Sequence, residues 1–152
     1  DLAALLERGV EARAVAEGEM TVFGGAQSRA FLHVRDVAQV MVDHATTDVT
    51  GTFNVHAENA TILELAERIK GHVPTASVVV QPAGLDETGD VRLSSDRARS
   101  LLGFRPRRTL DDGIREVRDL VASGRLKDIR MPRYSNAAFF SAHPLQDDYI
   151  YN

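Results

Sequence analysis

Residues 22–38 read VFGGAQSRAFLHVRDVA, and this stretch decides how the chain is expected to fold. Apolar, β-prone residues lie on both sides of Gly24-Gly25. They predict a strand from Met20 to Phe23, a turn, and a second strand from Phe31 to Val34. Asp36 is expected to cap the helix that follows, because its carboxylate can accept from the free N–H groups of the first turn. The stretch therefore predicts strand, turn, strand and helix in close succession.

Arg29 follows the glycine turn, and its role can be interpreted in two ways. The turn lets backbone approach a ligand closely, Phe23 can lie against a base, and Arg29 can pair with a diphosphate through charge-assisted hydrogen bonds. Alternatively, Gly24-Gly25 is the turn of a β-hairpin and Arg29 lies on the surface. The glycine pair is not a dinucleotide fingerprint, because the G-x-G-x-x-G spacing and the following helix are missing.

The rest of the chain alternates helical and strand patterns. A capping-box pattern, Thr61-Ile62-Leu63-Glu64, marks one helix start, and Thr109 marks another. Val37, Val40, Met41 and His44 have the spacing of a buried helix face. We therefore expect an α/β fold with a small mixed sheet and about five helices. The expected helices lie at residues 1–17, 36–44, 62–73, 96–102 and 110–123, and two further strands lie at residues 51–55 and, as a buried strand, 76–80.

Composition limits the classes of function. A net charge of −4 argues against general nucleic-acid binding through a basic surface. No apolar run approaches the ~20 residues of a membrane span. The absence of cysteine excludes disulfides and thiolate metal sites, and the five histidines lack metal-ligand spacing. These features predict a cytoplasmic protein without a metal, a membrane or a nucleic acid as partner.

The C-terminal segment differs from the rest of the chain. It lacks helical or strand periodicity, yet it holds five of the nine aromatic residues. A free tail is rarely this aromatic, so we expect it to dock on a surface of this chain or of a partner. We accordingly divide the chain into a lobe at residues 1–130 and an aromatic tail at residues 131–152.

The stretch that opens this section resembles the substrate-domain signature of the extended short-chain dehydrogenase/reductase enzymes that act on nucleotide sugars. That signature has the form V/I-Y/F-G-x-G-x-Q-x-R-D-F/Y-x-x-V-x-D-V/L-A. The second glycine lies one place early, at Gly25, and Ala30 replaces an aspartate. The resemblance continues in the correct order through residues 52–55, 62–66, 89–92, 98–106, 109–114 and 132–136. The matching positions are Val22, Phe23, Gly24, Gln27, Arg29, Phe31, Val34, Asp36, Val37 and Ala38.

This resemblance implies a substrate site. In the family, the residue equivalent to Arg29 binds the nucleotide diphosphate, and the residue equivalent to Phe23 lies against the base. A second arginine contacts the phosphates, but Glu87 stands at its position here, and Arg92 is the nearest substitute. The candidate substrate-binding residues are Val22, Phe23, Gln27, Arg29, Phe31 and Arg92.

The resemblance also implies a larger enzyme. Catalysis in the family needs a Tyr-x-x-x-Lys pair and NAD or NADP, and this sequence has neither that pair nor a glycine-rich pyrophosphate turn. We therefore expect the substrate-binding part of an NAD(P)-dependent nucleotide-sugar epimerase, dehydratase or reductase, without the Rossmann domain and without a catalytic residue or cofactor of its own. Its expected partners are a nucleotide-diphosphate sugar and a Rossmann domain or companion chain, with a homo-oligomer as a further option. The alternative is a truncated, non-catalytic module for nucleotide binding or protein interaction.

Overall fold

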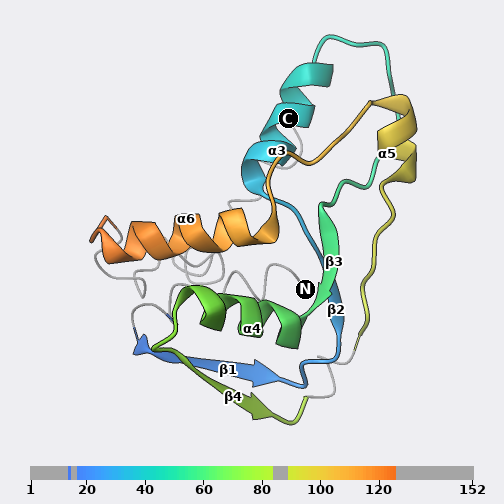
Figure 1. Ribbon diagram of the computed structural model, residues 1–152. Coiled ribbons are helices and arrows are strands. Elements are labelled where there is room, and N and C mark those ends of the chain that lie inside the picture. Colours follow the sequence, from blue (N-terminus) through green and yellow to red (C-terminus); the bar gives the residue numbers. More distant parts are fainter. Residues whose placement is uncertain (1–13, 15–16, 84–88, 126–152) are drawn as a thin grey trace, which may run out of the picture.

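A computed structural model describes residue 14 and residues 17–83 and 89–125 (Figure 1). The described part contains four helices and four strands, which confirms the mixed α/β class. The helix expected near the N-terminus and the aromatic tail fall outside the described residues, apart from Ala14 and Glu17. In chain order the elements are β1 (Glu19–Phe23), β2 (Ser28–Phe31), α3 (Val34–His44), β3 (Glu58–Thr61), α4 (Ile62–His72), β4 (Ser77–Gln81), α5 (Asp96–Leu101) and α6 (Leu110–Ala122).

The described strands form two separate two-stranded sheets instead of the single mixed sheet expected. β1 pairs in parallel with β4, so that Glu19 lies opposite Ser77. β2 pairs antiparallel with β3, so that Ser28 lies opposite Thr61. Because β1 and β2 belong to different sheets, the hairpin interpretation is wrong. The turn at Gly24 instead sends the chain from one sheet into the other.

The hydrophobic core lies around α4. In Figure 1, α4 runs between the β1–β4 pair and α6. Leu65 and Ile69 of α4, Met20 of β1 and Ile114 of α6 are each no more than 2% exposed. Their helical and strand spacing places these side chains on inward faces, where burial of apolar area stabilises the fold. We call this part, made of α4, α6 and the two sheets, the body.

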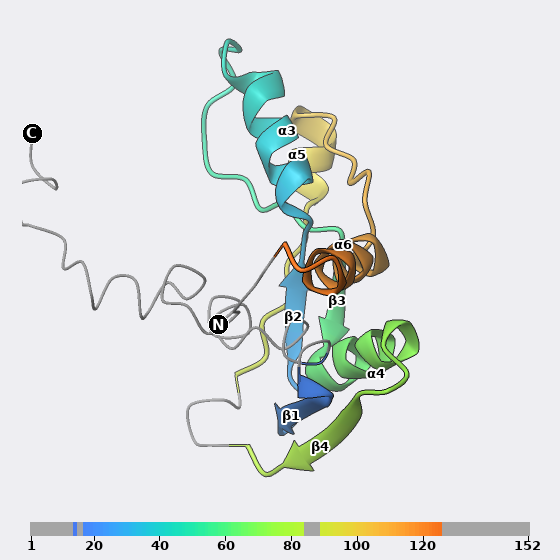
Figure 2. The same cartoon turned by 90° about the vertical axis from the view of Figure 1, so that its left-hand side faces the viewer.

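α3 and α5 lie together at one end of the molecule, beyond α6, and we call them the arm (Figures 1 and 2). The buried face expected on α3 is only partly present. Met41 is 68% exposed, whereas Val37, Val40 and His44 are half-buried. The sequence spacing is helical as predicted, but within the described residues little packs against this helix.

Three strand predictions need correction. β2 covers residues 28–31 instead of 31–34, and residues 51–55 form no strand. The strand in that region is β3, which begins at Glu58, because its residues find a partner in β2. β4 lies where a buried strand was expected, but Val79 and Val80 are exposed, since β4 pairs with β1 on one side only.

The helix starts show which local signals were decisive. The Thr61–Glu64 capping box is present, and Thr109 caps α6 through a second box with Asp112. For α3 the predicted cap was wrong. His33 caps the helix by accepting from the backbone N–H of Arg35, while Asp36 lies within the first turn. The Asp36 carboxylate instead accepts hydrogen bonds from the backbone N–H groups of Arg107 and Arg108. Among the described helices, none has the length and apolar character of a membrane span.

Candidate functional site

The glycine turn between β1 and β2 is held in a single shape by Gln27. The Oε1 atom of Gln27 accepts from the Gly25 N–H at 2.7 Å, and its Nε2 atom donates to the Phe23 carbonyl at 2.7 Å. Gly24 has a φ of 74°, and a Cβ there would lie 2.9 Å from the Cβ of Ala83. The turn therefore requires glycine both for its backbone angle and for its close packing.

The same turn is joined to the start of α4. The Leu63 N–H donates to the Gly25 carbonyl at 3.0 Å, and the Ile62 N–H donates to the Gln27 carbonyl at 3.1 Å. These bonds satisfy donors of the first helical turn that have no partner within a helix. As a result the backbone around Gly25 has a fixed position relative to the core.

Arg29 lies on β2 and is only 8% exposed. Its Nη1 atom donates to the carbonyls of Ser28, at 2.8 Å, and Gly89, at 2.5 Å. Its Nε atom is buried and has no hydrogen-bond partner among the described residues. Within the part of the chain that the structure describes, this buried guanidinium also has no carboxylate partner, so it keeps capacity to bind an anion. The structure therefore rejects the surface position that the hairpin interpretation gave Arg29.

Arg92 approaches the same place from a distant part of the sequence. Its Nη1 atom donates to the Ser28 hydroxyl at 3.2 Å. Ser28 also donates its backbone N–H to Asp90 at 2.5 Å, and its carbonyl accepts from the Val91 N–H at 3.0 Å. Residues 89–95, which we call the strap, thus lie across β2 and bring Arg29 and Arg92 to the same serine.

The other candidate residues lie in different environments. Val22 is 2% exposed and Phe31 is 7% exposed, and both pack in the hydrophobic core. Phe23 is half-buried at the end of β1, next to the glycine turn. The structure therefore places Gln27 against the turn and both Arg29 and Arg92 against Ser28. Phe23 ends β1 beside the turn, while Val22 and Phe31 lie in the hydrophobic core.

Sequence reasoning missed the groups that join these pieces together. Gly89 and Asp90 belong to a motif segment that gave no residue role beyond Arg92, and Ser28 attracted no attention. Ser95 immediately precedes α5, yet its hydroxyl forms no cap bond and contacts His56 instead. Of these residues, Gly89 and Asp90 had a sequence signal, as part of the Gly89–Arg92 match.

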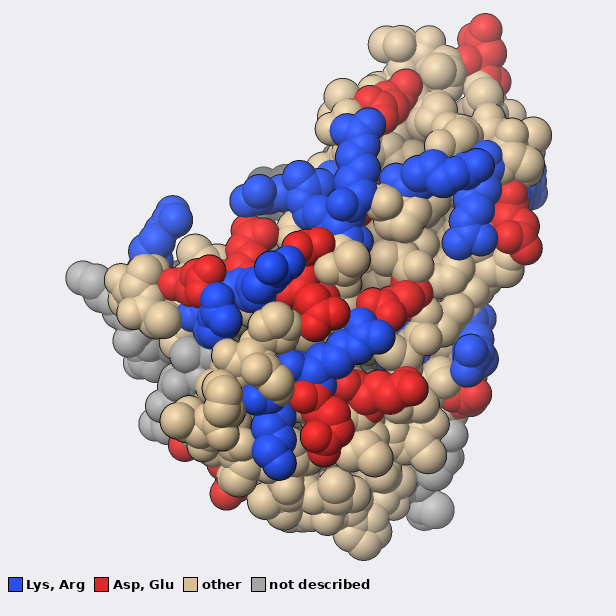
Figure 3. All heavy atoms as spheres, in the orientation of Figure 1, with Lys and Arg blue, Asp and Glu red and all other residues tan. Residues whose placement is uncertain are grey.

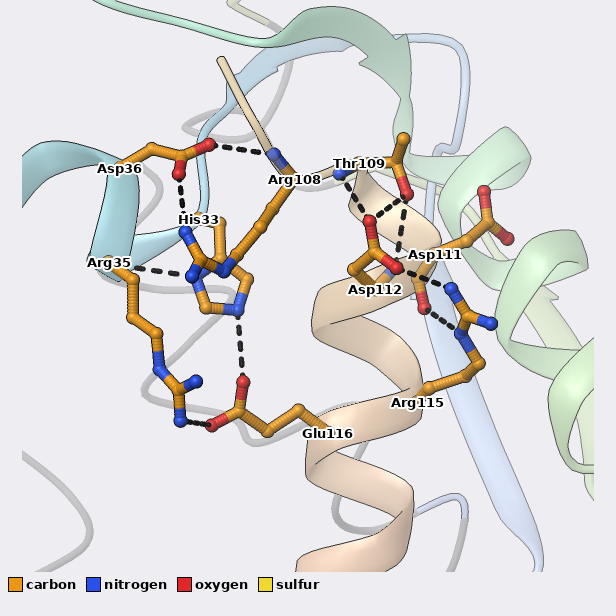
Figure 4. Close-up of polar contacts among 9 residues, drawn as sticks. All are labelled: His33, Arg35, Asp36, Arg108, Thr109, Asp111, Asp112, Arg115 and Glu116. Carbon is orange, nitrogen blue, oxygen red and sulfur yellow. Dashed lines mark hydrogen bonds and ion pairs between the residues drawn. The ribbon is translucent and has the colours of Figure 1, made fainter.

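A second polar cluster joins the arm to the body (Figure 4). His33 lies 3.1 Å from Glu116 through Nε2, and Glu116 accepts from Arg35 at 3.0 Å. Asp36 is buried and accepts from the backbone N–H groups of Arg107 and Arg108 and from the Arg108 guanidinium, at 2.7–2.9 Å.

Burial alone would raise the pKa of the Asp36 carboxyl. The hydrogen bonds from Arg107 and Arg108 outweigh that effect and hold its pKa below the usual range. Since these groups satisfy one another across the junction, we interpret the cluster as a structural joint.

The charge distribution gives no sign of a continuous basic surface over the helices of the body. On the face shown in Figure 3, basic side chains over α6 and α4 are interspersed with acidic ones. Ion pairs account for much of this mixing, including Arg68 with Glu58 and Arg115 with Asp112. Among the described residues, no group of three histidine, aspartate or glutamate side chains could hold a metal ion.

The Gly24-Gly25 turn does not have the form of a pyrophosphate-binding turn. A pyrophosphate turn joins a strand to the N-terminus of a helix, where backbone N–H groups face the phosphates. Here Gly24 and Gly25 join β1 to β2, and the Gly25 N–H is already bonded to Gln27.

The chain is similar to enzymes of nucleotide-sugar metabolism. It is 34% identical over 118 residues to a GDP-L-fucose synthase from Oryza sativa subsp. japonica, a match that covers 75% of this chain and 34% of the relative. It is 30% identical over 106 residues to UDP-glucuronic acid decarboxylase 1 from Arabidopsis thaliana, covering 68% and 24%. The chain thus spans about a quarter to a third of the length of these relatives. No protein-family model matches it.

Solved structures share the fold. An NAD-dependent NDP-hexosamine 5,6-dehydratase of tunicamycin biosynthesis aligns with a TM-score of 0.70 and 21% identity, over 81% of this chain and 42% of that one. UDP-glucuronic acid 4-epimerase from Bacillus cereus, solved with UDP-glucuronic acid and NAD, aligns with a TM-score of 0.64 and 18% identity, over 78% and 40%. Together with the sequence relatives, these matches show that the chain belongs to the extended short-chain dehydrogenase/reductase family and corresponds to part of its members' length.

Proposed function

We propose that this chain is the substrate-binding part of an NAD-dependent nucleotide-sugar epimerase, dehydratase or reductase, and that it binds the nucleotide diphosphate. The observation that carries this proposal is the convergence of Arg29 and Arg92 on Ser28 beside a rigid glycine turn. The names of the relatives support a nucleotide sugar as the ligand.

Each candidate residue has a distinct role in this proposal. Arg29 supplies the buried positive charge, and Arg92 supplies a second, more exposed one. Phe23 offers an apolar surface at the turn for the base, while Gln27 holds the turn's shape. Fixing the non-reacting nucleotide in this way supplies binding energy that orients the sugar for chemistry elsewhere.

The chemistry itself is assigned to residues beyond this chain. In the complete enzyme a Rossmann domain, in the same protein or a companion chain, would hold NAD and provide the catalytic tyrosine and lysine. NAD would exchange a hydride with the sugar when bound. We expect the 152-residue chain alone to bind nucleotide sugar without turning it over.

Calorimetric titration with UDP-glucuronic acid and GDP-L-fucose tests the proposal. A hydrogen bond to a charged group contributes ~1.5–3 kcal/mol, so Arg29→Gln should weaken binding about tenfold to a hundredfold. Arg92→Gln should weaken it less, because Arg92 is exposed. Arg118→Gln, on α6 and paired with Asp119, is the matched control and should bind as the unaltered chain does.

Two results would overturn the proposal. One is the absence of heat with either nucleotide sugar from a chain shown to be folded by its thermal transition. The other is unchanged affinity in both Arg29→Gln and Arg92→Gln. Because Arg29 is buried and its replacement can lower stability, the exposed Arg92 variant keeps the test decisive.

A further inference from the structure

The polar side chains of His56, Asn59 and Ser95 form a connected network at the end of the strap that is farther in sequence from Gly89. His56 is 6% exposed and Ser95 is fully buried. Nδ1 of His56 lies 2.5 Å from the Ser95 hydroxyl oxygen, which also accepts from the His56 backbone N–H at 2.9 Å. Nδ2 of Asn59 lies 3.2 Å from Nε2 of His56. Buried polar groups in such a network fix one another's orientation.

The orientation of Asn59 is set by the strap. Its Oδ1 atom accepts from the Leu93 N–H at 2.9 Å, and its Nδ2 atom donates to the Leu93 carbonyl at 3.0 Å. If the Asn59 amide were rotated by 180°, its NH2 group would face the Leu93 N–H and its oxygen would face the Leu93 carbonyl. Both hydrogen bonds would then be lost. Asn59 of β3 thus holds the strap in the way that a neighbouring strand would.

This fixed amide determines the protonation of His56. Because Asn59 presents an N–H group, Nε2 of His56 must act as the acceptor. The remaining proton then lies on Nδ1, which donates to Ser95. Adding a proton at Nε2 would set two N–H groups against each other at 3.2 Å and break the link. The network is therefore complete only with a neutral imidazole.

The charged neighbours of His56 lie on α5. Burial lowers the pKa of His56, the positive charge of Arg99 lowers it further, and the carboxylate of Asp96 opposes both. Asp96 and Arg99 also pair with each other at 3.1 Å. Since the folded state favours the neutral ring, the stability from this network is complete above the usual histidine pKa of about 6.5. That stability is lost as the pH falls further, through the lower pKa of the folded state.

The strap connects this network to the candidate phosphate groups. Leu93 and Ser95 are held by Asn59 and His56 at one end of the strap. At the other end Gly89 contacts Arg29, and Arg92 contacts Ser28. The position of both guanidinium groups therefore depends on a segment that the network ties to β3.

We propose that His56 and Asn59 are positioning residues for the arginine pair, and that protonation of His56 releases the strap and weakens binding of a nucleotide diphosphate. This inference rests on the proposed function. Neither residue touches the ligand, and both act through the strap. It assigns the site an acid sensitivity that the two arginines alone would not give it.

The test combines a ring measurement with a binding profile. In the 152-residue chain, nitrogen NMR should show the Nδ1–H tautomer of His56 and a titration below the usual value of about 6.5. Affinity for UDP-glucuronic acid, whose phosphates and carboxylate stay ionised throughout, should be constant above the His56 titration seen by NMR and should fall as the pH is lowered through that titration. His56→Gln should remove most of this dependence, whereas His72→Gln, a partly exposed control on α4, should keep it.

The outcomes separate this inference from the proposed function. Binding with a flat pH profile, or an Nε2–H tautomer of His56, would overturn the positioning role while the proposed function stands. No binding at any pH would overturn the proposed function, and the positioning role with it. If His56→Gln does not fold, hydrogen exchange at the Leu93 amide of the unaltered chain decides. The protection of that amide, measured relative to the intrinsic exchange rate at each pH, must decrease as the His56 ring takes up its proton. Unchanged protection would refute the release of the strap.

Discussion

The body and the arm of this chain are held together by different means. In the body, Leu65, Ile69 and Ile114 are almost completely buried, and apolar packing stabilises the structure. In the arm, Val34, Met41 and Val42 are at least 68% exposed. The arm is tied to the body largely through polar groups such as Asp36 and His33. The difference shows that the same helical periodicity yields a buried face only where the chain supplies a surface to cover it.

The largest expected effect comes from the body. Ile69→Ala removes a fully buried side chain from α4 and should lower the free energy of unfolding by about 2–5 kcal/mol. Urea denaturation of the chain measures this loss. The matched change in the arm, Met41→Ala, should alter stability by no more than about 0.5 kcal/mol. Equal losses in the two variants would remove the distinction between the two regions.

The next effect concerns the joint between them. Asp36→Ala leaves two backbone N–H groups and the Arg108 guanidinium without their acceptor and should destabilise the chain by about 2–4 kcal/mol. The ion pair alone does not account for the upper part of that range, because the Arg108 side chain is 34% exposed and solvent screens its charge. Asp119→Ala, an exposed control on α6, should be nearly neutral. A neutral Asp36→Ala would show that the joint is not held by this carboxylate.

The pH dependence of the joint has a defined sign. The folded state lowers the pKa of Asp36, so its contribution to stability is complete above the usual aspartate value of about 3.9. The contribution is lost as the pH falls through the lower folded-state pKa. Denaturation of the chain and of Asp36→Ala should therefore converge in strong acid. A stability difference that persists there would contradict this account.

The smallest effect tests a local signal within the body. Thr61→Ala removes the side-chain acceptor of the α4 capping box and should cost about 1 kcal/mol. Thr61→Ser keeps the hydroxyl and should retain most of that stability. Thermal denaturation compares the two, and equal losses would show that the methyl group of Thr61, rather than its hydroxyl, matters.

Local signals in the sequence predicted local structure well. The capping box at Thr61, the helix start at Thr109 and the apolar spacing of α4 are all confirmed. Asp36 failed as a cap because its carboxylate binds donors 71 and 72 residues away, which no local pattern reveals. The strand expected at residues 51–55 failed for a related reason, since a strand needs a partner and the described residues provide none there.

The site was partly predictable. A family resemblance indicated Arg29 and Arg92 separately, but their shared contact with Ser28 depends on the strap crossing β2. The sequence did not indicate the roles of Asn59 and His56. The Asn59 amide bonds the backbone of Leu93, and it also contacts the His56 ring, and both contacts are known only from the three-dimensional structure. The sequence thus indicated residue types, while their mutual geometry required the fold.

The most direct test of the central claim is a map of the ligand on the backbone. Adding UDP-glucuronic acid to the nitrogen-labelled chain should shift most strongly the amide signals of Ser28 and Gly89, which contact the arginine pair, and of Gly25 in the glycine turn. Arg29→Gln should greatly reduce these shifts at the same ligand concentration. Shifts concentrated on α3 and α5, or none at saturating ligand, would contradict a diphosphate site at the glycine turn.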